Sequence, residues 1–141
     1  MTIAVSKRIK EITLQVIKAD MIINWLLALM FIFFPRFFQR LIAEGDIFQI
    51  WLWRLIGITL IIFAGWQVKI IKRGKTTQGE LGFLVLATFT PAALLAAGLF
   101  MDFPLYHSSR LLLWVADFYM LSLGAFYLYV LKKHRRASTN V

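Results

Sequence analysis

Apolar residues along this chain form long uninterrupted runs, without the short alternating stretches that are typical of soluble domains. Four runs stand out, at about residues 21–38, 48–68, 81–101 and 109–131. A helix needs about 20 predominantly apolar residues to cross the ~30 Å core of a bilayer. The pattern therefore predicts an all-α integral membrane protein, built as a four-transmembrane-helix bundle in which the whole chain is one membrane domain.

The first apolar run has the fewest residues before an interruption, which here is Pro35. Met21 to Phe34 would give about 14 helical residues, or roughly 21 Å of rise. Two extensions are available. The helix can begin near Ile12, with Lys18 and Asp20 reaching back to the membrane surface, or the chain can bend at Pro35 and lay the next apolar residues along the surface. Proline disfavours helix at the residue before it, and we expect both extensions to contribute.

Residues 1–20 have a different pattern. Val5, Ile9, Ile12 and Val16 recur at spacings of four, three and four, and most of the basic residues lie off that stripe. Such a pattern predicts a short amphipathic helix lying in the head-group layer. A solvated extension of the first span accounts for the pattern equally well.

Charge then indicates the orientation. The chain carries 16 basic and 7 acidic residues, a net charge of +9. Four basic residues precede the first span, four lie between the second and third, and four follow the fourth, in the tail at 132–141. This bias predicts a multi-pass protein of the plasma (inner) membrane with both termini in the cytoplasm. The partners expected for these basic clusters are anionic lipid head groups on the cytoplasmic side, and we expect no nucleic-acid partner.

Two charges lie inside the apolar runs. Arg54 and Asp117 would each lie roughly 9–12 Å from the same end of their spans. Each shares a helical face with a glycine, Gly57 and Gly124, and small residues mark faces where membrane helices approach closely. We therefore predict an intramembrane ion pair between the second and fourth spans. Such residues are candidates for a functional site, although a pair of this kind can also serve only to fix the helices, and Arg54 could instead reach the surface.

Two uncharged polar residues lie in the opposite half of the membrane. Asn24 in the first span and Gln67 in the second can hydrogen-bond to each other or face water. Polar pairs between membrane helices contribute about 1 kcal/mol. We treat both residues as further candidates for a polar or ligand-binding site.

The third span contains a proline among small residues. Pro91 removes one backbone hydrogen bond and predicts a kink. The pairs Ala92–Ala96 and Ala93–Ala97 that follow predict close packing, either centrally in the bundle or against a second subunit.

Several chemistries are not expected. The chain has no cysteine and only two histidines, neither of them inside an apolar run, so we predict no metal centre and no cofactor. No arrangement of residues resembles a catalytic triad, a pair of acids within the membrane or a phosphate loop. We expect a non-enzymatic accessory, scaffolding or assembly protein, homo-oligomeric or bound to a larger membrane partner. The alternative is a small oligomeric channel or transporter, or a lipid-type ligand-binding protein, that uses Arg54 and Asp117.

Overall fold

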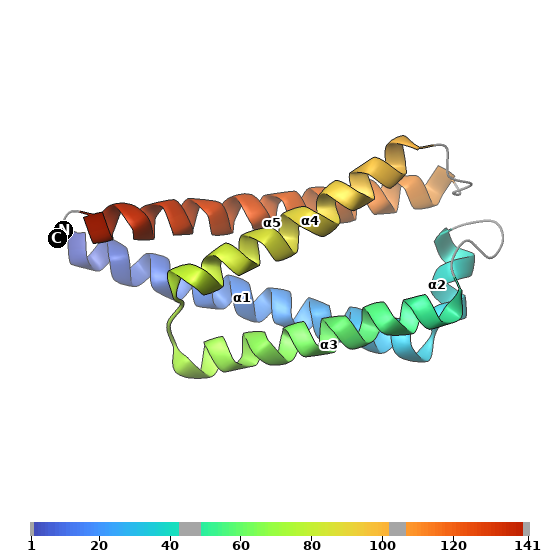
Figure 1. Ribbon diagram of the computed structural model, residues 1–141, viewed down its shortest axis with the longest axis horizontal. Coiled ribbons are helices and arrows are strands. Elements are labelled where there is room, and N and C mark those ends of the chain that lie inside the picture. The colour runs from blue at the N-terminus through green and yellow to red at the C-terminus, as the bar shows by residue number, and fades with distance from the viewer. Residues whose placement is uncertain (1, 43–48, 102–106, 140–141) are drawn as a thin grey trace. The chain divides into compact units, whose positions relative to one another are not determined.

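The computed structural model of the chain describes residues 2–42, 49–101 and 107–139. All of the regular structure in these residues is helical (Figure 1). Every helix except the second is long and apolar enough to cross a membrane. This confirms the prediction of an all-α chain with four candidate spans. The helices are α1 (Thr2–Phe33), α2 (Pro35–Ile42), α3 (Ile50–Arg73), α4 (Gln78–Phe100) and α5 (His107–Thr139).

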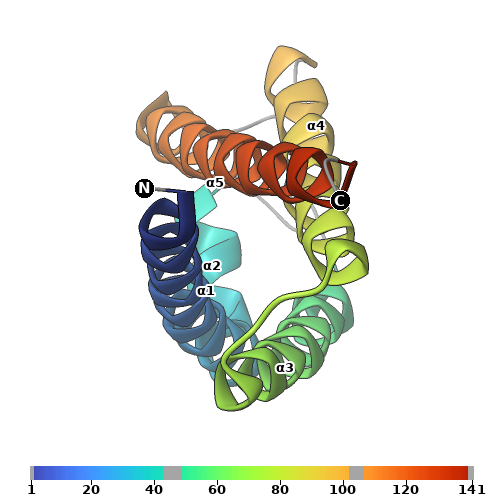
Figure 2. The ribbon, with the colours of Figure 1, turned by 90° about the vertical axis from the view of Figure 1, so that its left-hand side faces the viewer.

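The chain divides into two compact units, Met1–Lys75 and Thr76–Val141. In the first unit, α1 and α3 lie side by side and antiparallel, and α2 packs at one end of the pair (Figures 1 and 2). In the second unit, α4 and α5 form an antiparallel pair. The prediction of a single membrane domain concerns how the units combine, and it stays a prediction.

The first span and the N-terminal segment form one continuous helix, because α1 runs unbroken from Thr2 to Phe33. The placement of residues 1–20 in the head-group layer or in water stays a prediction. The span ends at Phe33, earlier than residue 38, because Pro35 disfavours helix at Phe34. The carbonyl of Phe34 then accepts from the backbone N–H groups of Phe37 and Phe38, at 3.1 and 3.4 Å, and α2 begins.

The residues between the two units determine where α3 ends and where α4 begins. Gly74 ends α3 in the left-handed conformation (φ +67°), and its N–H donates to the carbonyls of Ile70 and Ile71. A glycine adopts this conformation without steric cost. Thr77 then begins α4 with a capping box, in which its hydroxyl accepts from the N–H of Glu80 (3.2 Å) and its own N–H donates to the Glu80 carboxylate (2.8 Å).

A glycine brings α1 and α3 into close contact. A Cβ atom added to Gly57 would lie 2.7 Å from Cγ1 of Ile32 and 3.0 Å from the carbonyl oxygen of Ala28. Beyond this contact, towards α2, Phe31 stacks on Trp53 with ring centroids 5.3 Å apart. The interface between α1 and α3 therefore combines a backbone approach with an aromatic contact one turn away.

The pair formed by α4 and α5 is built in the same way. A Cβ atom on Gly124 would lie 2.9 Å from Oγ1 of Thr88 and 3.0 Å from the ring of Phe89. At the C-terminal end of α4, the rings of Phe100 and Trp114 meet edge to face, with centroids 5.4 Å apart. Together these contacts fix which face of α5 is turned towards α4.

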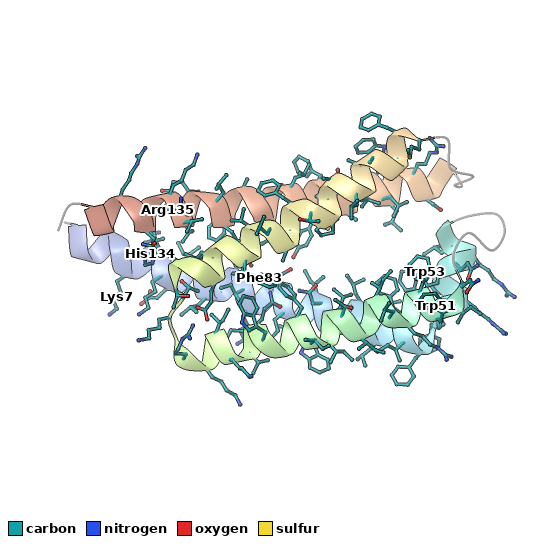
Figure 3. The ribbon with its side chains drawn as sticks, viewed as in Figure 1. Lys7, Trp51, Trp53, Phe83, His134 and Arg135 are labelled. Carbon is teal, nitrogen blue, oxygen red and sulfur yellow. The ribbon has the colours of Figure 1, made fainter. Side chains whose placement is uncertain are left out.

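The outward faces of the spans are apolar. Ile62, Leu94 and Phe118 are 69%, 69% and 73% exposed, respectively, and Figure 3 shows side chains projecting outward along all of the long helices. The buried positions, in contrast, include polar residues: Thr13, Asp20, Asn24, Gln67, Thr88, Ser109 and Asp117. This distribution is the one expected of helices that face lipid.

The contact at Gly57 leads to a test with a matched control on the same helix. Gly57→Ala should lower the free energy of unfolding by about 1–3 kcal/mol, because the new methyl group would push against the Ala28 carbonyl. Gly65→Ala should be neutral or slightly stabilising, since nothing lies within 4 Å of its added Cβ and alanine favours helix over glycine. Unfolding of the detergent-solubilised protein by a denaturing detergent measures both. Equal effects would show that Gly57 is not a packing position.

Candidate functional site

A hydrogen-bonded chain of three polar side chains crosses the interface between α1 and α3. Asp20 and Asn24 lie one turn apart on the same face of α1, and Gln67 of α3 lies between them. The Gln67 amide nitrogen donates to Oδ2 of Asp20 at 2.7 Å, and the Asn24 amide nitrogen donates to Oε1 of Gln67 at 3.2 Å. The three residues are only 5%, 9% and 0% exposed, respectively, so the network is interior.

The donors in this network point in one direction. Asn24 donates to Gln67, and Gln67 donates to Asp20, so both amides orient towards the carboxyl group. In a medium of low dielectric constant these hydrogen bonds strengthen one another, because each bond polarises the next. The arrangement can hold a buried acid in place and join two helices.

Asp20 is the residue that the sequence interpretation missed. We expected it to reach the membrane surface beside Lys18, and this was wrong, because Asp20 is buried whereas Lys18 is exposed. The reason is the position of Asp20 on α1. It belongs to the face turned towards α3, which also carries Thr13, Ile17, Asn24 and Ala28. The spacings of four, three, four and four in that face were a signal available in the sequence.

Asn24 and Gln67 are brought together, which settles the choice left open between a mutual hydrogen bond and contact with water. Their use by a ligand stays a prediction.

Asp117 is a buried acidic residue of the second unit. It is 2% exposed, and its Oδ1 atom has no hydrogen-bond partner among the residues that the structure describes. It lies on α5 between Trp114 and Gly124, both of which contact α4, so the same face of α5 directs it towards α4. Burying a carboxyl group without a hydrogen bond is unfavourable. We therefore expect the Asp117 carboxyl group to have a counter-charge, a proton or a ligand.

Arg54 belongs to the other unit. It is exposed on α3, whereas Gly57, three residues further on, is buried against α1. The guanidinium group thus lies outside the α1–α3 interface. Because Arg54 and Asp117 belong to different units, their ion pair stays a prediction.

Helix α4 continues through Pro91 without a break. The Thr88 hydroxyl, just before it, donates to the carbonyls of Leu84 and Val85 at 2.9 and 3.0 Å. This hydroxyl therefore does not serve the carbonyl of Ala87 that Pro91 leaves without its helical donor. The kink itself stays a prediction.

The two alanine pairs of α4 differ in their surroundings. Ala92 is fully buried and Ala96 partly buried, whereas Ala93 and Ala97 are exposed. One small-residue face of α4 is therefore used within the second unit, and the other is open to a further contact.

No group of three or more histidine, aspartate or glutamate side chains that could hold a metal occurs within residues 2–42, 49–101 and 107–139. Comparison of the chain with protein-family models, with curated proteins and with solved structures finds no significant match. The buried polar residues are therefore interpreted from their own geometry.

The network predicts a non-additive effect of substitution. Gln67→Leu should lower the free energy of unfolding by about 1–2 kcal/mol, because it removes one hydrogen bond from each of two buried polar groups, Asp20 and Asn24. The triple change Asp20→Leu, Asn24→Leu and Gln67→Leu should be less destabilising than the sum of its three parts, since each of the two hydrogen bonds is then lost with both of its partners. Gln15→Leu, at an exposed position of α1, is the control and should have little effect. An additive triple variant would contradict the network.

Proposed function

We propose that this chain is a small non-enzymatic four-span membrane protein that acts as an accessory, scaffolding or assembly component through helix–helix contacts. The proposal is supported best by the way the buried polar residues of the first unit hydrogen-bond. Asp20, Asn24 and Gln67 hydrogen-bond to one another across two helices of one chain. Polar groups used in this way join helices, and they support a structural protein better than a polar path for a solute.

A further contact surface is available on α4. Ala93 and Ala97 are exposed and lie one turn apart, next to Leu94, which is 69% exposed. Without a hydrophobic driving force between helices in lipid, association depends on close packing, and small residues permit it. This face is therefore our candidate for contact with another copy of the chain or with a larger membrane protein.

The distribution of the basic residues supports a protein of the plasma (inner) membrane whose two termini lie in the cytoplasm. Twelve of the sixteen lie in the three segments that a four-span topology places on one side. In this orientation α2 and the start of α3 lie on the opposite side.

The chain has no natural cysteine, so an introduced cysteine is a unique site for a test. A benzophenone attached at Ala93→Cys should cross-link to protein in native membranes, either to a second copy or to a partner. The same group at Ile62→Cys, the control on the exposed face of α3, should cross-link mainly to lipid. In intact cells, a membrane-impermeant maleimide should leave Lys133→Cys unlabelled. Cross-linking to lipid alone at both positions, with monomers in mild detergent, would contradict the proposal.

The second candidate function is a channel, a transporter or a lipid-type ligand-binding protein. It is favoured by the buried Asp117 carboxyl, whose Oδ1 atom has no hydrogen bond in the described part of the chain. Arg54, exposed on α3, would supply the opposite charge of that site.

An ion pair between Arg54 and Asp117 predicts coupling between two substitutions. Asp117→Asn and Arg54→Gln should each lower the free energy of unfolding, by up to about 3–5 kcal/mol if the surviving charge is buried. The double variant should be less damaged than the sum of the two. Lys69→Gln, exposed on α3, should add to Asp117→Asn without coupling. Additive effects for Arg54 as well would show that the pair does not form.

A further inference from the structure

The short helix α2 presents three different faces. At 100° per residue, Phe38 and Gln39 point to the protein, and the Phe38 ring contacts Phe31 at 4.7 Å and Trp53 at 6.4 Å between centroids. Gln39 is only 5% exposed. These contacts fix how α2 is rotated against the ends of α1 and α3.

That rotation leaves an apolar face and a basic face outside. Phe37 and Leu41, one turn apart, are 55% and 41% exposed. Arg36 and Arg40, also one turn apart, are exposed and form no ion pair with any described residue. The two outer faces are adjacent, about 100° apart around the helix.

Helix α2 lies where a membrane surface is expected. It follows directly after the last residue of the first candidate span, Phe33, and Figure 1 shows it crossing the end of the α1–α3 pair. Figure 3 places Trp51 and Trp53 at this end and Lys7 towards the other. Trp51 is 57% exposed, and exposed tryptophans are typical of the interface between lipid and water.

We propose that α2 binds a phospholipid at the membrane surface, with Arg36 and Arg40 receiving its phosphate and with Phe37 and Leu41 against its acyl chain. Guanidinium groups pair with phosphate oxygens through two parallel hydrogen bonds. A helix with neighbouring basic and apolar faces is suited to lie in the head-group layer. An acidic protein segment would satisfy the arginines but would leave the neighbouring apolar face without a partner. The inference rests on the membrane location of the proposed function.

The test uses the full chain with a nitroxide at Phe34→Cys, an exposed position immediately before α2 that leaves all four proposed lipid contacts in place. The detergent-solubilised protein is titrated with phosphatidylglycerol, and separately with a phosphate-free glycolipid that has the same acyl chains. We expect phosphatidylglycerol to immobilise the label at a lower concentration than the glycolipid. Arg36→Gln and Arg40→Gln should each weaken the response to phosphatidylglycerol about fivefold, whereas the exposed control Lys69→Gln should not change it.

Two results would overturn the proposal. Equal responses to the two lipids would show that the contact is only apolar. Unchanged titrations in the arginine variants would show that the guanidinium groups do not bind the phosphate. A failure of the proposed function appears elsewhere, in the cross-linking at Ala93, because that experiment does not depend on α2.

Discussion

The structure depends on one constraint, that a polar group away from water must find its partner inside the protein. Helices satisfy the constraint for the backbone, because each N–H group bonds within its own segment. A hydroxyl side chain can satisfy it within its own helix, as Thr88 does, but longer polar side chains can satisfy it between helices. In the first unit the amide of Gln67 does so by joining Asp20 and Asn24. The pairing of α1 with α3, and the choice of which faces meet, follow from this arrangement.

Close approach and polar bonding support each other in this unit. Aspartate and asparagine have short side chains, so they reach a partner on another helix only where the two backbones come near. Gly57 provides that approach ten residues from Gln67, about 15 Å along α3. The aromatic contact of Phe31 with Trp53 holds the same interface at its other end. The hydrogen bonds therefore benefit from packing that lies at a distance from them.

Much of the fold was predictable because lipid imposes simple requirements on sequence. The length of the apolar runs predicted the four candidate spans, and Pro35 marked a kink or an end, although the first run was expected to reach residue 38 and α1 ends at Phe33. The continuity of α1 was not predictable, since an amphipathic stripe is compatible with a separate surface helix and with an extension of the span. The burial of Asp20 was missed because a charge near the end of an apolar run is normally explained by the nearby surface. Its donor lies 47 residues away on another helix, and only tertiary structure shows it.

The position of the polar network along the chain has a consequence for biogenesis. All three of its residues lie in the first half of the sequence, and the capping residues at Gly74 and Thr77 separate that half from the next. In the proposed four-span topology, the buried polar groups of α1 and α3 can thus hydrogen-bond to one another as soon as α3 enters the bilayer, before the second half is synthesised. Asp117 enters later, within the last 25 residues of the chain. In that topology the order of synthesis delivers the α1–α3 hairpin first, and the buried carboxyl group of Asp117 follows it.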